Sequence, residues 1–378
     1  MHNVVIAGVG IHPFGRFDLS YRQLGAAAAR DALADAGIGL HQLDMILVAN
    51  VGAEMAKGQN SIDLVGRPGV PIMNLEAACA SSAGTLLFAS RLIESGGAKA
   101  VLCLGMEKAP RGFIAGAGFE QWQTESGLGV TAMYFALLAQ ELLATTDATV
   151  ADLADISVKN HRHAVDNPNA MYRKEFSREE VLGSRMVCPP LSLLMLCAPN
   201  EGAAAAVLVS EAYARDLGIA QPVRLNAVEV VSRSTDDWFV PAASRQSTGM
   251  TSITARAARQ AYEEAGIGPE DLDLVECQDT DAPSELWAYR DLGLCAPGDE
   301  AALLRSGATS LGGRLPVNPS GGLLSKGEPL GASGMGQVHE IVQQLRGRSG
   351  PRQVPGARAG LSHVMGAGHN AAVLVATR

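Results

Sequence analysis

The chain has 378 residues and 47% hydrophobic content, so it can bury a large core and is long enough for two domains of ordinary size. Its formal net charge of -9, without any cluster of Lys and Arg, argues against a nucleic-acid partner. No apolar run is long enough to cross a bilayer, and the N-terminus MHNVVIAGVG lacks the basic region and cleavage site of a secretory signal, so we expect a cytoplasmic protein.

The first predicted elements are a strand over Val4 to Ala7, a helix that ends at Gly37 and a strand over Met45 to Ala49. A glycine at a helix end is typical of a left-handed C-cap. The segment AARDALADAGIGLHQLD at 28–44 matches AARQAYEEAGIGPEDLD at 257–273 at ten of seventeen positions. Self-similarity of this kind indicates that the fold contains a duplicated unit.

The run NLEAACASSAG at 74–84 places Cys79 among small residues, where an extended segment turns into a helix. We expect that helix over about Ser82 to Ser95, because apolar residues recur there with helical spacing. The positive end of its dipole would favour a thiolate at Cys79. A free cysteine is also often a buried space-filling residue, so this run alone leaves a nucleophile and a core residue both open.

The composition changes between about residues 107 and 199, where Gly, Met and charged residues are frequent. We interpret this stretch as an insertion in the first half that helps to build a substrate pocket. Helices are expected within it at Met133 to Ala144 and at Val150 to His163.

The remaining strands and helices complete an α/β pattern that predicts two sheets with helices around and between them. We place the first half at 1–222, including the insertion, and the second half at 223–378. The further strands are predicted at Ala100 to Leu104, Ala204 to Val209, Val223 to Val231, Leu274 to Cys277, Ala357 to Leu361 and Ala371 to Val375.

The cysteines and histidines do not have the spacing of a metal site or of a disulfide framework. We therefore expect reduced thiols and no metal. The six cysteines are Cys79, Cys103, Cys188, Cys197, Cys277 and Cys295.

These residues together resemble the thiolase superfamily, specifically its sterol-carrier-protein-type branch of lipid-transfer-like thiolases. The resemblance runs the length of the chain and implies a five-layered αβαβα fold of two like halves. It also implies an enzyme that forms or cleaves a carbon–carbon bond next to an acyl-CoA thioester. The matching motifs are the Cys79 segment, VKNHRHAVDNPNA at 158–170, APNEGAAAAVLVSE at 198–211, LPVNPSGGLLSKGEPLGASG at 315–334 and QLRG at 344–347.

By this resemblance Cys79 carries the acyl group, since a thiolate exchanges readily with a thioester. The backbone N–H groups of Cys79 and of Gly366, in HVMGAG at 363–368, would form the oxyanion hole. Coenzyme A enters as part of the substrate, and no separate cofactor is expected. Lys159, Arg162, His163 and Lys326 are candidates to bind the CoA phosphates; a solvated charged surface is the alternative.

The chain departs from the family at its acid–base positions. Glu328 stands where the family has a histidine between Gly and Pro, and Gln278 stands at a position that is His or Asn in thiolases, while Asp279 beside it matches. Ionised Glu328 can only accept a proton, and its charge would raise the pKa of Cys79. If burial keeps it protonated, Glu328 can donate to a thioester oxygen, and Gln278 can supply a second N–H or position a water.

Several alternatives for these positions stay open. Glu328 can also be a surface carboxylate, and Gln278 a partly buried polar residue at a strand end. His363 and His369 flank the Gly366 loop and could replace the missing base, although either can equally be a hydrogen-bonded bystander.

Three functions follow from the resemblance. The first is an acyltransferase that works through acyl-Cys79. The second is a retro-aldolase that acts on a β-hydroxyacyl-CoA with a partner subunit bearing an OB-fold and a zinc ribbon, although relatives of that kind carry tyrosines at the altered positions and this chain has none there. The third is a non-catalytic subunit that binds acyl-CoA. Family members are dimers or tetramers, so a homodimer is expected.

Overall fold

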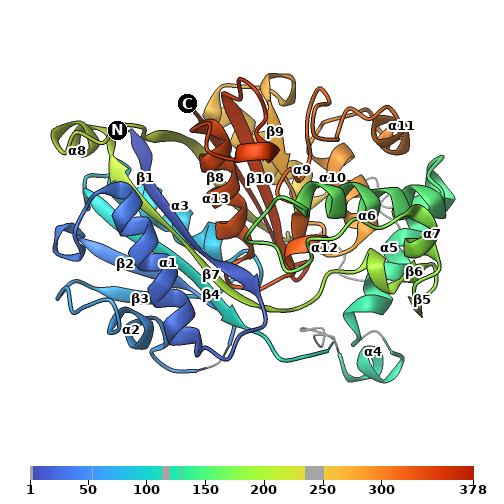
Figure 1. Ribbon diagram of the computed structural model, residues 1–378, viewed down its shortest axis with the longest axis horizontal. Helices are drawn as coiled ribbons and strands as arrows, with labels where there is room; N and C mark the ends of the chain where they lie inside the picture. Colours follow the sequence, from blue (N-terminus) through green and yellow to red (C-terminus); the bar gives the residue numbers. More distant parts are fainter. Residues whose placement is uncertain (1–2, 53, 113–119, 128, 235–250) are drawn as a thin grey trace.

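A computed structural model describes residues 3–52, 54–112, 120–127, 129–234 and 251–378 (Figure 1). Nine strands in the described part of the chain form one mixed sheet in the order β3-β2-β4-β7-β1-β8-β11-β10-β9. Their bounds are β1 Val4–Gly15, β2 Met45–Ala49, β3 Ile72–Leu75, β4 Ala100–Lys108, β7 Glu201–Ser210, β8 Val223–Ser232, β9 Leu274–Glu276, β10 Ala359–Gly366 and β11 Asn370–Thr377.

The two halves of the chain each supply a contiguous part of this sheet. β1 pairs along its length with β7 but with β8 only through Val5 and Ile6, which oppose Arg224 and Val223. The two expected sheets are therefore joined edge to edge through this short contact, and they diverge beyond it.

Helices complete five layers. Helix α1 (Tyr21–Ala36) packs on β1 and β7, and α9 (Ile253–Ala265) packs on β8 and β11. Between the two half-sheets lie α3 (Ser81–Glu94) and α13 (Ser333–Leu345), which contact strands of both halves. The predicted αβαβα arrangement is confirmed (Figure 1).

The duplicated segments fold in the same way. Helices α1 and α9 end at Gly37 and Gly266 with φ of 67° and 70°, in the left-handed region that favours glycine. A single 3-10 turn follows each helix, at Leu40–Gln42 and at Pro269–Asp271. Asp44 then accepts the N–H groups of Lys99 and Ala100, and Asp273 accepts those of Arg358 and Ala359, so each half fixes its next parallel strand by the same contact.

Small residues allow helix and sheet to approach closely. A Cβ atom added at Gly8 or Gly10 of β1 would come within 2.3 Å of the α1 backbone. Glycine is therefore required at both positions for α1 to lie against this strand.

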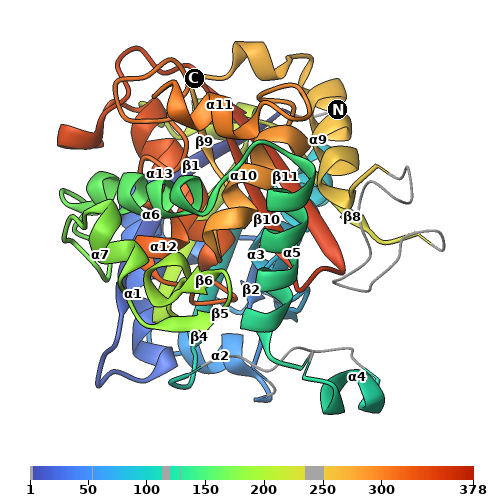
Figure 2. The same cartoon turned by 90° about the vertical axis from the view of Figure 1, so that its right-hand side faces the viewer.

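The predicted insertion forms a group of helices beside the second half-sheet (Figure 2). Helices α5 (Thr131–Thr145) and α6 (Val150–Ala164) pack against α10 (Ala282–Asp291), and α6 also packs against α12 (Gly322–Lys326). The insertion contains α4 Gln121–Glu125, α5 Thr131–Thr145, α6 Val150–Ala164, α7 Arg178–Leu182, β5 Met186–Cys188 and β6 Leu191–Ser192. The other helices are α2 Lys57–Ile62, α8 Glu211–Asp216 and α11 Glu300–Arg305.

Among the residues described, no helix combines the length and the apolar character needed to cross a membrane.

Candidate active site

Cys79 lies in the tight turn that leads from β3 into α3. Ala78 adopts a left-handed conformation with φ of 50°, and Ser81 Oγ accepts the Ala77 N–H at 2.8 Å and donates to the Ala78 carbonyl at 2.5 Å. These contacts fix the backbone on both sides of the cysteine. Its side chain is only 9% exposed and lines a cavity of about 320 Å³.

The cavity is bounded mainly by α5, α10, β10 and the loops around Cys79, Gln278 and Glu328. Its surface is mostly apolar, with hydroxyl and carboxyl groups at intervals, as in many small-molecule sites. It is lined by Val51, Glu76, Ala78, Cys79, Thr131, Ala132, Tyr134, Phe135, Leu138, Leu196, Cys197, Pro199, Thr254, Gln278, Thr280, Ser284, Trp287, Ala288, Asp291, Glu328, Leu330, His363, Met365, Ala367 and Gly368.

Glu328 lies on the short segment after α12, where Gly327 has φ of 82°. A Cβ atom at Gly327 would fall 2.0 Å from Asn200 Nδ2, so a larger residue has no room there. The Glu328 N–H donates to the Ala198 carbonyl at 2.9 Å, and its side chain, 5% exposed, lines the cavity. The carboxyl group is therefore buried and not the surface carboxylate that the sequence left open.

Gln278 joins Glu328 to β10. Its Oε1 accepts the Met365 N–H, which fixes the amide so that Nε2 donates to Glu328 Oε1 at 3.1 Å. The amide thus orients one oxygen of the carboxyl group. Gln278 is buried and lines the same cavity.

The expected stabilisation of a thiolate by the helix dipole is outweighed. Burial raises the pKa of Cys79 well above its ordinary value, and the charge of Glu328 raises it further, although the Ala367 N–H and Gln278 act in the opposite direction. Burial raises the pKa of Glu328 to about 7, against the lowering effect of its hydrogen bonds with Cys79, Cys197 and Gln278. Near neutral pH, Cys79 is therefore a thiol, and Glu328 is divided between acid and carboxylate.

Gly366 ends β10 directly against the Cys79 turn. A Cβ atom there would lie 2.3 Å from the Ala77 carbonyl oxygen and 3.2 Å from Ala80 Cβ, so only glycine permits this approach. The backbone N–H of the next residue, Ala367, lowers the pKa of Cys79. The predicted oxyanion position at Gly366 is thus adjacent to the thiol, and its role remains a proposal.

The two histidines near this loop have different surroundings. His363 is buried on β10, lines the cavity, and has Nε2 at 3.1 Å from Thr254 Oγ1. His369 follows the turn, with Nδ1 at 2.6 Å from an Arg233 guanidinium nitrogen.

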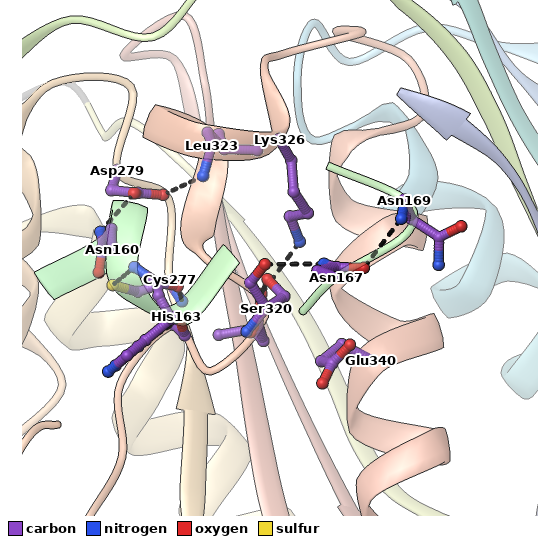
Figure 3. Close-up of polar contacts among 12 residues, drawn as sticks. Asn160, His163, Asn167, Asn169, Cys277, Asp279, Ser320, Leu323, Lys326 and Glu340 are labelled. Carbon is purple, nitrogen blue, oxygen red and sulfur yellow. Dashed lines mark hydrogen bonds and ion pairs between the residues drawn. The ribbon is translucent and has the colours of Figure 1, made fainter. Parts of the chain in front are cut away.

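Asp279 fixes the start of helix α12, the helix that leads to Glu328. Its carboxyl group accepts the N–H groups of Leu323 at 2.6 Å and Leu324 at 3.3 Å, at the start of α12, and the Asn160 side-chain amide at 2.7 Å (Figure 3). The carboxyl group therefore anchors the N-terminus of the helix whose other end presents Glu328.

The two lysines predicted to bind CoA phosphates are buried in ion pairs, which contradicts that role. Lys159 Nζ lies 2.6 Å from Glu285 Oε1 and 2.8 Å from the Val317 carbonyl. Lys326 Nζ lies 3.2 Å from Glu276 Oε2 and extends inward from α12 (Figure 3). Their partners come from distant segments, so the sequence pattern could not distinguish these lysines from solvated ones.

His163 is also internal and unsuited to phosphate. Its Nδ1 is 3.0 Å from the Asn318 carbonyl, and its Nε2 accepts the Leu311 N–H at 3.0 Å. Burial lowers its pKa to about 3, so the ring is neutral at ordinary pH. Arg162 is exposed on α6 but does not line the cavity, and its predicted contact with CoA stays a prediction.

Cys197 also lines this cavity, and the sequence did not predict a role for it there. Its Sγ lies 3.5 Å from Glu328 Oε2. The sequence feature that could have indicated this location is the position of Cys197 directly before the APNEG motif at 198–202.

Comparison with known proteins gives matches over both halves of the chain. The family model described as "Thiolase, N-terminal domain" matches residues 4–212, and "Thiolase C-terminal domain-like" matches residues 240–378. "Benzoylsuccinyl-CoA thiolase subunit BbsB" of Thauera aromatica is 39% identical, over 97% of this chain and 95% of that protein. "Sterol carrier protein 2" of Homo sapiens is 35% identical, over 97% of this chain and 70% of that protein.

Among solved structures, the "Ltp2-ChsH2(DUF35) aldolase" superposes with a TM-score of 0.85 and 24% identity. The match covers 99% of this chain and 97% of the other. At this identity the likeness establishes the fold only.

Proposed function

Because this chain belongs to the thiolase family, we propose that it is an acyl-CoA acyltransferase that forms or cleaves a carbon–carbon bond through an acyl-Cys79 intermediate. The observation that carries the proposal is the meeting of the Cys79 thiol and the Glu328 carboxyl group in one buried cavity. An acid whose pKa is about 7 is partly ionised near neutrality, so Glu328 can act there as a proton acceptor and as a proton donor.

The first half-reaction needs one proton acceptor. Cys79 sulfur attacks the thioester carbonyl carbon while its proton passes to the Glu328 carboxylate. The tetrahedral oxyanion collapses, the carbon–sulfur bond to CoA breaks, and the CoA thiolate takes the proton from Glu328. Backbone N–H groups of Cys79 and of the Gly366 turn are the proposed donors to the oxyanion.

The second half-reaction returns the same carboxyl group to its starting state. Ionised Glu328 removes the α-proton of a second thioester, and the resulting carbanion attacks the acyl carbonyl on Cys79. The bond to sulfur breaks, and the Cys79 thiolate takes that proton from Glu328. One carboxyl group thereby replaces the family histidine in both directions of proton transfer.

A covalent adduct tests this proposal. The protein incubated with acetyl-CoA or benzoyl-CoA should gain the mass of the acyl group on the peptide that contains Cys79, and Cys79→Ala should not. Absence of the adduct with both thioesters at pH 8, in protein that is folded, would reject the acyl-enzyme route. Benzoyl-CoA is included because a relative is named for a benzoylsuccinyl thioester.

A retro-aldolase that works with a partner subunit is the second candidate. It is suggested by the name of the solved structure that shares this fold, which is an aldolase, and by the name of the 39% identical relative, which is a thiolase subunit. Against it, Gln278 and Glu328 stand where the aldolase relatives carry tyrosines. Cleavage of a β-hydroxyacyl-CoA that survives in Cys79→Ala, in the presence of a small OB-fold and zinc-ribbon protein, would favour this candidate.

We further propose that the chain forms a homodimer. Strand β3 lies at one edge of the sheet, and its Met73 side chain is 54% exposed. An uncovered edge with an exposed apolar side chain is a common site of association.

A further inference from the structure

A second thiol contacts the proposed catalytic acid. Cys197 lies on the segment before β7, lines the cavity, and places its Sγ 3.5 Å from Glu328 Oε2. The opposite oxygen, Oε1, accepts Gln278 Nε2 at 3.1 Å. The Glu328 carboxyl group is therefore held on both oxygens.

The backbone fixes this arrangement. The Cys197 N–H donates to the Thr280 carbonyl at 2.8 Å. The carbonyl of the next residue, Ala198, accepts the Glu328 N–H at 2.9 Å, and the Asn200 N–H donates to the Glu328 carbonyl at 3.3 Å. Because the two segments run side by side and are hydrogen-bonded, the thiol and the carboxyl group are held in one relative position.

We propose that Cys197 is a positioning residue for the proposed reaction. Its S–H holds Glu328 Oε2, directs the carboxyl group toward Cys79 and stabilises the carboxylate form that accepts the Cys79 proton. The inference rests on the proposed function, because it takes Glu328 as the group that receives this proton. In this proposal Cys197 acts through Glu328 and does not itself bond to the substrate.

The charges around Glu328 are consistent with this role. Burial is the largest influence and raises the pKa of Glu328 to about 7; Asp281, at the start of α10, raises it too. The hydrogen bonds from Cys79, Cys197 and Gln278 lower it. The titratable groups that face the carboxyl group or line its cavity are Cys79, Cys197, Glu76, Tyr134, Asp281, Asp291 and His363.

The experiment measures proton transfer without acyl-CoA. The rate of Cys79 alkylation by iodoacetamide is followed against pH by peptide mass spectrometry, which separates Cys79 from the other cysteines. In the wild-type protein we expect the rate to rise with an inflection near pH 7, as Glu328 ionises. In Cys197→Ala the inflection should move upward by roughly one pH unit, because a donor to the carboxylate is lost. This shift makes alkylation about fivefold slower at pH 7.

Two further variants make the result specific. Cys197→Ser retains a hydroxyl donor and should return the inflection to the wild-type value or below it. Cys188→Ala removes a thiol that does not line the cavity and should leave the profile unchanged. An unchanged inflection in folded Cys197→Ala, or a Cys197→Ser profile displaced upward by the same amount as that of Cys197→Ala, would overturn the inference. Failure of acyl-CoA to form an adduct would overturn the proposed function, while the alkylation profile would still decide the role of Cys197.

Discussion

At the scale of single residues, Glu328 determines what chemistry the cavity can perform. A buried carboxyl group with a pKa of about 7 is present in both forms near neutral pH, so it can accept a proton in one step and donate it in another. The same group lies among Asp281 and two thiols, so its charge is poorly compensated. The site therefore has a stability cost that should be measurable.

We expect Glu328→Gln to be more stable than the wild-type protein above pH 7. The pKa of Glu328 is raised from 4.5 to about 7 in the folded state. A raised folded-state pKa contributes stability that is present below about pH 4.5 and is lost as pH rises through 7. The neutral amide avoids this loss, which amounts to about 3 kcal/mol at pH 8. Urea unfolding at pH 5 and pH 8 should give a difference between the two proteins that grows with pH; a constant difference would show that Glu328 does not titrate in this range.

The sequence predicted part of this residue-scale arrangement. Cys79, Glu328 and Gln278 were expected to meet at one thioester, and the structure brings all three side chains to one cavity. Cys197 was not expected there, since nothing in a local pattern shows which distant carboxyl group a thiol faces. The burial of Lys159 depends likewise on Glu285, which is 126 positions away in the chain.

At the scale of elements, the short helix α12 sets the position of Glu328. A five-residue helix is too short to be stable by itself, so its orientation depends on contacts at its ends. Asp279 supplies these contacts at the N-terminus through the Leu323 and Leu324 N–H groups. The tight packing of Gly327 against Asn200 fixes the other end.

Asp279→Ala should lower the free energy of unfolding by about 2 kcal/mol, because two buried backbone donors lose their acceptor. It should also slow Cys79 acylation, since Glu328 is less firmly placed. Asp299→Ala is a matched control, because Asp299 precedes α11 without a side-chain bond to that helix. Equal effects of the two substitutions in urea unfolding and in acylation would contradict the role assigned to Asp279.

Most long elements could be predicted from their periodicity and caps, but β3 could not. The matched glycines at the ends of α1 and α9 gave strong signals because each has a local backbone function. Strand β3 has only four residues, one of them Asn74, and its identity depends on pairing with β2.

At the scale of the whole molecule, the cavity is lined by residues from both halves of the duplicated fold and from the insertion. Cys79 comes from the first half, Glu328, Gln278 and β10 from the second, and α5 from the insertion. The pairing of β1 with β8 that joins the halves involves two residues of each strand. No local pattern encodes so short a contact, so the continuous sheet could not be predicted.

The proposed homodimer gives a mass prediction. Light scattering of the purified protein should give about twice the chain mass of 39.3 kDa. Met73→Lys should shift the population toward 39.3 kDa, because it adds a charge at the exposed edge of β3. A wild-type protein that stays at 39.3 kDa at high micromolar concentration would exclude the dimer.

The most direct test of the account is the pH dependence of Cys79 acylation by acyl-CoA, measured by rapid quench and mass spectrometry. In the wild-type protein the rate should rise with an inflection near pH 7, the pKa of Glu328. In Glu328→Gln it should fall at pH 8 by about 10² to 10⁴, the usual contribution of a general base, and the inflection should disappear. Equal rates and the same pH profile in both proteins would show that Glu328 does not receive the Cys79 proton.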